Sequence, residues 1–176
     1  MKKKIAFVHN AMWEMYNFRG ELLQELKAKG YEITVICPPD EKNAHYFTDL
    51  GIKLLTVPMS RKGTNIKEDV QLVKNLFKVY KKEKFDLVFH YTIKPNIYGT
   101  LAAKLAGIKS IAITTGLGYV FLHNNITSLI AKFMYKFSLA FANEVWFLND
   151  DDMNIFLDKD LITERQAFKL PSEGIN

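Results

Sequence analysis

The sequence is poor in cysteine and in long apolar runs. Its single cysteine, Cys37, cannot form an internal disulfide and cannot by itself complete a zinc site. No apolar run approaches the roughly 20 residues that a membrane-spanning helix needs, and the apolar stretch after the lysines at 2–4 is too short for a signal peptide. We therefore expect a soluble, cytoplasmic protein, and 176 residues fit a single domain.

Several signatures of nucleotide-dependent and hydrolytic enzymes are also absent. There is no G-x-G-x-x-G, which argues against a dinucleotide fingerprint, and no G-x-x-x-x-G-K-[ST], which excludes P-loop chemistry. There is no G-x-S-x-G either, so a hydrolase of that type has no support. The acidic run 150–152 lacks partner ligands at metal-binding spacing and suits the start of a helix. We expect no metal and no other cofactor.

The charge of the chain is unevenly distributed. The formal net charge is +5; residues 1–84 hold 16 Lys/Arg against 10 Asp/Glu, whereas residues 85–176 hold 8 against 9. A basic half favours anionic partners such as nucleic acid, anionic lipid or sugar phosphates, and a solvated, solubilising helix face is the alternative. No recognised nucleic-acid-binding motif accompanies the basic residues, so a nucleic-acid partner is not expected.

Short β-branched runs alternate with longer helical patterns, in a composition that is 48% apolar and 24% charged. The predicted strands are 4–9, 33–37, 53–57, 86–89, 109–114 and 144–148. The predicted helices are 18–29, 45–50, 66–83, 95–106, 127–142 and 150–157, and Gly30, Gly51 and Gly107 end three of them. Buried strands that alternate with helices predict an α/β fold, a Rossmann-like doubly wound parallel sheet with helices on both faces.

The helical patterns also predict which side chains face the core. In the helix at 18–29 the inward positions are Leu22, Leu23 and Leu26. In the helix at 66–83 they are Ile66, Val70, Val73, Phe77 and Tyr80, with lysines on much of the other face.

Sheets of this kind bind ligands beyond the carboxyl ends of their strands, so the residues after each strand form the candidate site. The loop after the first strand places Asn10 among aromatic side chains, which suits contacts with a sugar or a nucleotide. The alternative is a loop that packs Trp13 and Tyr16 on the domain's own core.

The loop after the fourth strand carries the densest set of polar groups. An imidazole, hydroxyls, an ammonium and an amide fall within ten residues, at His90, Tyr91, Thr92, Lys94 and Asn96. Lys94 offers a positive charge to a phosphate or a sugar hydroxyl, and a proline at the start of the next helix leaves nearby N–H groups free for an anion. A lone histidine such as His90 is more often structural than catalytic.

The loop after the fifth strand contains Thr115, Gly116 and Gly118. Glycines allow a ligand to approach the backbone closely, and this loop follows a strand expected at the same sheet edge.

The stretches YTIKPNIYG at 91–99 and TTGLGY at 114–119 resemble the N-terminal domain of glycosyltransferase family 4-like enzymes. The opening is also similar to that family, in IAFV at 5–8 with Asn10, in NFR at 17–19 and in GYEITV at 30–35. The resemblance covers essentially the whole chain and extends to bacterial transferases that build capsule, O-antigen or lipid-linked oligosaccharide. It implies the GT-B fold, in which two Rossmann-like domains face each other across a cleft.

The resemblance also implies a domain organisation. Residues 1–170 would be the N-terminal, acceptor-side domain, and 171–176 the start of an interdomain linker. The C-terminal donor-binding domain, with its Glu-x7-Glu motif and phosphate-binding Lys/Arg, is absent from this chain, so the fragment alone is expected to be inactive. The activity implied is hexosyl transfer, with retention, from a nucleotide sugar to a glycan or lipid-linked acceptor in surface polysaccharide biosynthesis. The implied partners are the nucleotide sugar, that acceptor and the protein's own C-terminal domain.

The same resemblance assigns roles to single residues. Many relatives have a histidine where Tyr91 aligns, and His90 stands one residue earlier, on the opposite face of the strand. Tyr91 is therefore the positional match, and His90 is the second candidate catalytic residue. The candidate substrate-binding residues are Asn10, Arg19, Thr92, Lys94, Asn96, Thr115, Gly116 and Gly118.

Two features fit a peripheral position on the inner face of the cell membrane. Lysines between 62 and 84 offer positive charge to anionic lipid. The helix at 127–142 carries Phe133, Phe137 and Phe141 beside Lys132 and Lys136, which suits a membrane surface. The alternative for this helix is burial against the sheet.

Two other functions stay open at this point. A sugar-nucleotide epimerase shares the two-domain fold, although the motif at 91–99 argues against it. A non-catalytic half that recruits a separate donor-binding chain to the membrane is the second.

Overall fold

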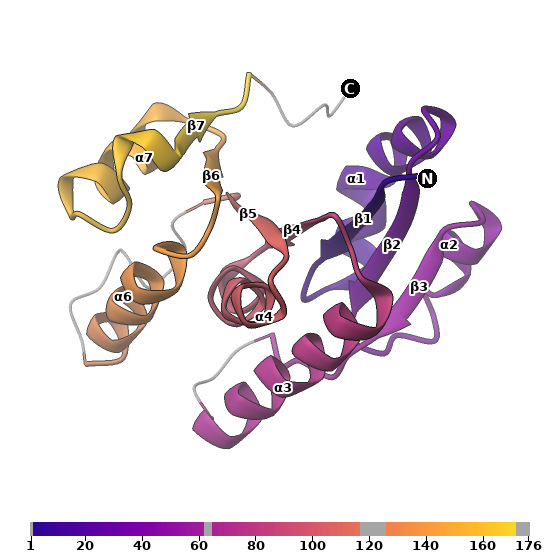
Figure 1. Cartoon of the computed structure of the whole chain (residues 1–176), viewed down its shortest axis with the longest axis horizontal. Helices are drawn as coiled ribbons and strands as arrows, with labels where there is room; N and C mark the ends of the chain where they lie inside the picture. Colours follow the sequence, from indigo (N-terminus) through magenta and orange to yellow (C-terminus); the bar gives the residue numbers. More distant parts are fainter. Residues whose placement is uncertain (1, 62–64, 117–125, 172–176) are drawn as a thin grey trace.

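The computed structural model describes residues 2–61, 65–116 and 126–171, which form one parallel sheet with helices on both faces (Figure 1). The seven strands follow the order β3-β2-β1-β4-β5-β6-β7. The strands are β1 (Lys4–Val8), β2 (Glu32–Cys37), β3 (Lys53–Thr56), β4 (Leu87–Tyr91), β5 (Lys109–Thr114), β6 (Glu144–Phe147) and β7 (Ala167–Lys169). The predicted Rossmann-like fold is confirmed, and β7 is a strand that the sequence prediction lacked.

The helices alternate with these strands. They are α1 (Met12–Ala28), α2 (His45–Asp49), α3 (Ile66–Glu83), α4 (Thr100–Ala106), α6 (Ile126–Leu139) and α7 (Asp150–Asp158), with the π-helical turn η1 (Pro95–Gly99) before α4 and the 3-10 turn η2 (Glu164–Gln166) before β7. Gly30 and Gly107 have φ of 92° and 74° just beyond α1 and α4, as predicted for residues that end a helix.

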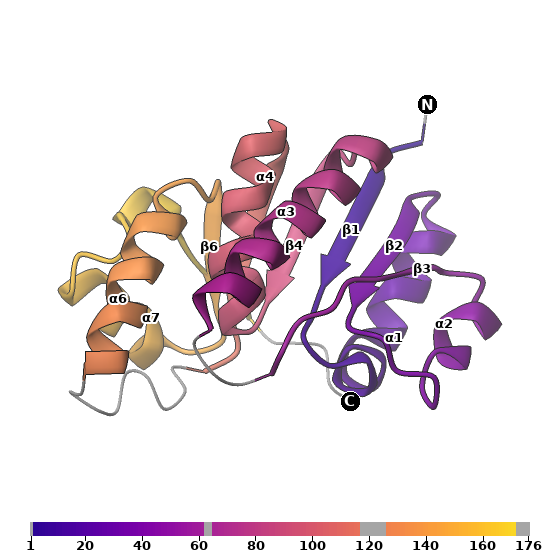
Figure 2. The same ribbon diagram turned by 90° about the horizontal axis from the view of Figure 1, so that it is seen from below.

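The two faces of the sheet carry different helices. Phe7 of β1 packs in a cluster with side chains of α1 and α2, such as Met15 and Phe47. Its neighbour Val8 points to the opposite face and packs with side chains of α3 and α4, such as Leu76. Helices α6 and α7 pack on that same face over β5 and β6, and Figure 2 shows α3, α4 and α6 beside one another.

Part of the α1 face is not covered by the described helices. A groove of about 910 Å³ lies there. It is lined by β4, β5 and β6 through Phe89, Ile113 and Trp146, and by the α1 residues 16–22. The Trp146 ring has aromatic neighbours on both sides, Phe89 and Phe168, each at a centroid distance of 5.5 Å.

Helix α1 begins six residues before the predicted start at Phe18. Its N-cap, Ala11, has no side chain that could bond the first N–H groups, so the sequence lacks the usual sign of a helix start. Burial of Met12 and Met15 holds this first turn in place. Leu22, predicted to face inward, is 40% exposed, whereas Leu23 is fully buried and Leu26 is partly buried against the core.

Helix α3 has the predicted bounds, and three of its five predicted inward residues contact the core: Tyr80 is buried, and Val73 and Phe77 are partly buried. Leu72, Leu76 and Tyr80 are buried, whereas Ile66 and Val70 are 79% and 49% exposed. Ile66 and Val70 lie in the first two turns, at the edge of the sheet, where a buried carboxylate, Asp69, takes the inward position.

Helix α6 carries apolar side chains on two opposite faces, one buried and one exposed. Tyr135 and Leu139 are buried against the sheet. For this face of the helix, the structure confirms the alternative prediction that the helix packs on the sheet. The opposite stripe is exposed and consists of Leu129, Ile130, Phe133 and Phe137, and the exposed Phe141 follows two residues after the helix. Across the described ranges, no helix is both long enough and apolar enough to cross a membrane.

Candidate functional site

The order of the strands in the sheet indicates where the candidate site lies. From β1 the chain crosses to β2 on one side, and from β4 it crosses to β5 on the other, so the order reverses between β1 and β4. Val8 pairs in register with His90, and Tyr91 with Ile113, so the ends of β1, β4 and β5 are level. A doubly wound sheet binds its ligand in the crevice at such a switch point. The residues that directly follow these three strands therefore lie side by side.

His9 occupies the end of β1 and was missing from the predicted site. The residue is 7% exposed, and its ring lies 6.0 Å from the Tyr91 ring, centroid to centroid. Nδ1 accepts a hydrogen bond from the N–H of Ala11 at 2.9 Å. Burial, and then the positive charges of Arg19 and Arg61, lower the pKa of His9 to about 4. At neutral pH the ring is therefore uncharged and carries its proton on Nε2, as a hydrogen-bond donor.

An acidic and a basic side chain stand in front of this histidine. Glu14 Oε2 lies 3.8 Å from Nε2 of His9, and the other oxygen of Glu14 is bonded to Arg61. The Arg61 side chain is 62% exposed, whereas that of Glu14 is 30% exposed. The only sign of this group in the sequence is the position of His9 at a strand end; Glu14 and Arg61 are 47 residues apart, and the fold alone brings them together.

Tyr91 and Arg19 are brought together on the α1 face of the sheet. The Arg19 guanidinium carbon lies 5.0 Å from the centroid of the Tyr91 ring, a cation–π contact. Arg19 is 6% exposed, and its Nη1 donates to the carbonyl oxygen of Phe18 at 2.8 Å. Both residues line the open groove beside the sheet. The structure thus places two predicted site residues in one contact.

His90 lies on the other face of the sheet and is corrected from a catalytic to a structural residue. Its side chain has no exposed surface, and burial lowers its pKa to about 3. Nε2 lies 2.9 Å from the hydroxyl of Tyr80, and Nδ1 lies 3.4 Å from that of Thr100. Gly99 packs directly on the ring. A side chain enclosed in this way cannot contact a substrate.

The loops at the three strand ends contain buried oxygen atoms that lack partners. Among the described residues, Asn10 Oδ1, Thr92 Oγ1, Asn96 Oδ1 and Thr114 Oγ1 are buried without a hydrogen-bond partner. Buried polar atoms are nearly always bonded, so oxygens of this kind indicate a place for a bound group or water. Three of them belong to predicted site residues; Thr114, the last residue of β5, was not predicted.

Asn96 is also fixed by a hydrogen bond across the sheet edge. Its Nδ2 donates to the carbonyl oxygen of Ile113 at 3.0 Å, which joins the turn after β4 to the end of β5. The residue is 1% exposed. Asn96 therefore joins the turn after β4 to the end of β5.

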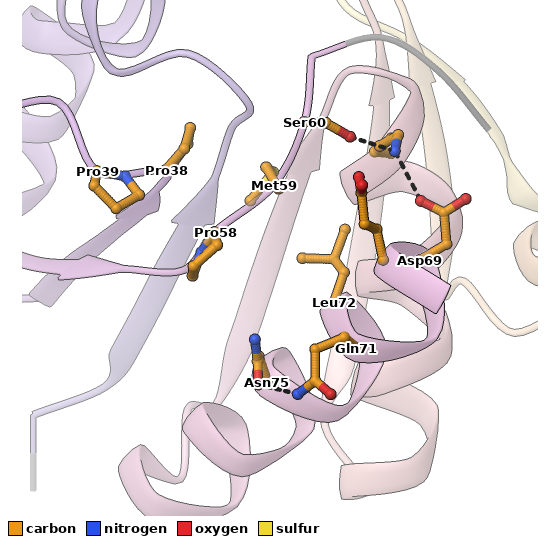
Figure 3. Close-up of a pocket in the computed structure, with 11 residues that line it drawn as sticks. Pro38, Pro39, Pro58, Met59, Ser60, Asp69, Gln71, Leu72 and Asn75 are labelled. Carbon is orange, nitrogen blue, oxygen red and sulfur yellow. Dashed lines mark hydrogen bonds and ion pairs between the residues drawn. The ribbon is translucent and has the colours of Figure 1, made fainter. Parts of the chain in front are cut away.

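The positive charge of Lys94 is paired with a carboxylate of the same chain. Its Nζ donates to Asp69 Oδ1 and to Ser60 Oγ, each at 2.7 Å (Figure 3). The side chains of Lys94 and Asp69 are only 10% and 8% exposed. Burial, and then Asp69, raise the pKa of Tyr98, whose hydroxyl donates to Asp69 Oδ2 at 2.8 Å. The expectation that Lys94 offers an unpaired charge to a phosphate is therefore corrected.

This ion pair borders a cavity of about 470 Å³ at the ends of β2 and β3 (Figure 3). One wall is apolar and the other carries amide and carboxylate groups. The lining residues are Pro38, Pro39, Pro58, Met59, Ser60, Glu68, Asp69, Gln71, Leu72, Asn75 and Lys94. Because Asp69 neutralises the one cation of this lining, the cavity suits uncharged groups better than a phosphate.

The loop after β5 is described only in part. Thr115 and Gly116 are exposed beyond the end of the strand, and Gly116 has φ of 144°, a conformation that favours glycine. Gly118 lies outside the described residues. The described residues contain no group of three or more His, Cys, Asp or Glu that could hold a metal ion.

Comparison with known proteins identifies the family. Residues 4–149 match the model of the family described as glycosyl transferase 4-like. The chain is 30% identical over 181 residues to the N,N'-diacetylbacillosaminyl-diphospho-undecaprenol alpha-1,3-N-acetylgalactosaminyltransferase of Campylobacter jejuni, covering 98% of this chain and 47% of that protein. It is 24% identical over 147 residues to the UDP-Gal:alpha-D-GlcNAc-diphosphoundecaprenol alpha-1,3-galactosyltransferase of Escherichia coli, covering 83% and 38%. The chain therefore spans about half the length, or less, of these relatives.

Solved structures share the fold at low sequence identity. A UDP-N-acetylglucosamine 2-epimerase superposes with a TM-score of 0.71 at 18% identity, covering 96% of this chain and 48% of that one. The Anabaena protein Alr3699/HepE, in complex with UDP and glucose, superposes with a TM-score of 0.70 at 15% identity, covering 99% and 45%. These likenesses support the fold, and the match over residues 4–149 decides the family. This chain belongs to the glycosyl transferase 4-like family.

Proposed function

We propose that this chain is the acceptor-side half of a glycosyltransferase that moves a sugar from a nucleotide sugar to a glycan or lipid-linked acceptor in surface polysaccharide biosynthesis. The observation that carries the proposal is the set of buried, unpartnered oxygens at the ends of β1, β4 and β5. Family membership and the names of the two relatives, both of which act on diphospho-undecaprenol-linked sugars, support the same reaction class.

The chemistry of this edge favours the acceptor over the donor. Several of the available groups are neutral: the Nε2–H of His9, and the oxygens of Asn10, Thr92 and Asn96. Of the charged side chains nearby, Glu14 is paired with Arg61, and the Arg19 guanidinium lies on the Tyr91 ring. Neutral donors and acceptors suit the hydroxyls of a sugar, whereas a leaving nucleoside diphosphate needs positive charge. Lys94 is paired with Asp69, and Arg61 with Glu14, so this side supplies little unpaired charge. We propose that a donor-binding half provides it, and that transfer proceeds with retention and without a metal cofactor.

The test is a transfer assay with the complete enzyme, a panel of nucleotide sugars and lipid-linked acceptors. Thr92→Val replaces an unpartnered buried hydroxyl with a methyl group of the same size, so the KM for the acceptor should rise about tenfold, as expected for one lost hydrogen bond in a desolvated site. Thr56→Val, at an exposed position of β3, is the matched control and should leave KM unchanged. Unchanged acceptor kinetics in Thr92→Val would refute the assigned site.

Other arms of the same assay separate the alternatives. Epimerisation of a UDP-sugar in the absence of any acceptor would favour the epimerase function. Transfer that requires the addition of a second, separate protein would favour a non-catalytic recruiting half. Loss of transfer after chelation of divalent cations would refute the metal-free reaction, and inversion at the anomeric carbon, read by NMR, would refute retention.

We also propose that α6 lies on the cytoplasmic surface of the cell membrane. Its exposed stripe places Phe133 and Phe137, 68% and 51% exposed, next to Lys136. Phe141 continues the stripe, with Lys104 Nζ 5.5 Å above its ring. Aromatic side chains with flanking lysines suit the boundary between headgroups and acyl chains of an anionic bilayer. Exposed lysines of α3, among them Lys74 and Lys78, lie on the same side of the sheet.

Vesicle sedimentation tests this position. The wild-type protein should bind vesicles that contain phosphatidylglycerol, and the binding should weaken as the salt concentration rises. Phe133→Ser should weaken it further, whereas Leu22→Gln, at an exposed position on the opposite face of the sheet, should not. Binding that is absent, or that responds equally to both substitutions, would refute the proposal.

A further inference from the structure

The turn that follows β4 has an unusual backbone. Thr92 has φ of 68°, in the left-handed region that a β-branched residue rarely adopts. The chain then continues into η1, a π-helical turn, which is rare and occurs frequently at functional sites. The N–H of Asn96 donates to the carbonyl oxygen of Thr92 at 3.0 Å and closes the turn. Such a conformation persists only where the surrounding structure holds it in place.

Asp69, in the first turn of α3, contacts this segment at two points. Its Oδ1 accepts from Lys94, which precedes η1, at 2.7 Å. Its Oδ2 accepts from the hydroxyl of Tyr98, which lies within η1, at 2.8 Å. Ser60, from the segment after β3, accepts from the same Lys94 ammonium. One carboxylate therefore connects α3 to a residue within the Thr92–Asn96 turn and to a residue just after it, and Lys94 adds a link to the segment after β3.

The ion pair between Lys94 and Asp69 is buried, which strengthens it. With the Lys94 and Asp69 side chains about nine-tenths buried, their charges interact in a medium of low dielectric. Asp69 is itself fixed, because its N–H donates to the carbonyl oxygen of Asn65, the N-cap of α3, at 2.9 Å. No other carboxylate among the described residues forms an ion pair with Lys94.

We infer that Asp69 is a positioning residue for sugar transfer, acting through Lys94 and Tyr98 to hold the oxygens of Thr92 and Asn96 at the sheet edge. The inference rests on the proposed function, because the reaction that these oxygens serve is the proposed one. It assigns to Lys94 the role of a structural link in place of a contact with a phosphate. Asp69 itself is 25 residues from Lys94 in the sequence, and no motif in its neighbourhood marks it.

Asp69→Asn in the complete enzyme is the first test. It should lower kcat by about 10- to 100-fold, as expected when reacting groups are displaced by a fraction of an ångström to one ångström, with little change in the KM for the nucleotide sugar. Hydrogen exchange of the Asn96 amide should accelerate while exchange in β1 stays unchanged. Because Asp69→Asn leaves a buried ammonium unpaired, the double variant Asp69→Asn/Lys94→Met provides a folded alternative that lacks both charges. It should show the same loss of kcat.

Glu83→Gln is the matched control. Glu83 lies at the other end of α3 and also bonds a lysine, Lys53 of β3, at 2.5 Å. This variant should leave kcat and the exchange of Asn96 unchanged. Unchanged kcat in both Asp69 variants would overturn the inference, as would a loss of kcat without faster exchange of Asn96. Absence of transfer by the wild-type enzyme with every donor would instead refute the proposed function, and the exchange measurement would still decide whether Asp69 holds the turn.

Discussion

Gly99→Ala tests the packing behind the candidate site. Gly99 has φ of −67° and ψ of −42°, which any residue adopts, so only the space around it limits the substitution. A Cβ at this position would lie 2.5 Å from Cδ2 and 2.6 Å from Nε2 of His90. The ring cannot move aside easily, because it is fully buried and bonded to Tyr80. Overpacking of this kind costs about 1–3 kcal/mol, and we expect the upper half of that range.

The measurement is the thermal midpoint of the purified chain. For a protein of this size about 2–4 °C are lost per kcal/mol, so Gly99→Ala should lower the midpoint by roughly 4–12 °C. Gly20→Ala is the matched control: its Cβ would lie 3.6 Å from the Tyr16 ring, an ordinary contact, and the helix of α1 gains about 0.5–1 kcal/mol from alanine. In a His90→Ala background the cost of Gly99→Ala should nearly vanish. The contact between Gly99 and the His90 ring would be refuted if Gly99→Ala had the thermal midpoint of the wild type. It would also be refuted if Gly99→Ala lowered the midpoint equally in the wild-type and His90→Ala backgrounds.

The remaining predictions concern buried charge. His9 and His90 have pKa values lowered to about 4 and about 3, so between pH 6.5 and about 4 the unfolded chain binds protons that the folded chain does not. Stability should therefore fall as the pH falls through this window, by up to about 1.4 kcal/mol per pH unit for each histidine; urea midpoints that are equal at about pH 7 and pH 5 would contradict this. Lys94→Ala leaves the Asp69 carboxylate buried and unpaired, and should cost about 3–5 kcal/mol of stability. In the same urea titration, the double variant Lys94→Met/Asp69→Asn should lose less stability than Lys94→Ala. An equal or greater loss of stability would contradict the buried Lys94–Asp69 ion pair.

The alternation of strands and helices was readable from the sequence because it is a local property. The run 33–37 is apolar over most of its length, as a strand buried on both faces must be. Six of the seven strands were predicted within three residues of their observed ends. The seventh, Ala167–Lys169, is three residues long, and pairing with β6 is what makes it a strand. The start of α1 was missed because it has no capping side chain.

The candidate site was predicted in outline and revised in its chemistry. Placement of Asn10, Thr92 and Asn96 at one sheet edge follows from parallel strands alone, since their carboxyl ends meet there. The functions of Lys94 and His90 did not follow, because each depends on a residue from another element. Nothing near Lys94 in the sequence indicates that Asp69 neutralises it. The position of His90 in its strand indicated the opposite face from Tyr91, but nothing near it indicates that Tyr80 and Thr100 enclose its ring.

By itself, then, the sequence determined the fold class, the edge of the sheet that carries the candidate site and the resemblance to the family, because periodicity and short motifs are encoded in adjacent residues. Only the tertiary structure decided which charges are already paired, which histidine stands at the site and which face of α6 is exposed. Those properties depend on distances between segments that lie 25 to 82 residues apart, such as Lys94 and Asp69 or His9 and Tyr91, and packing of the whole sheet sets such distances.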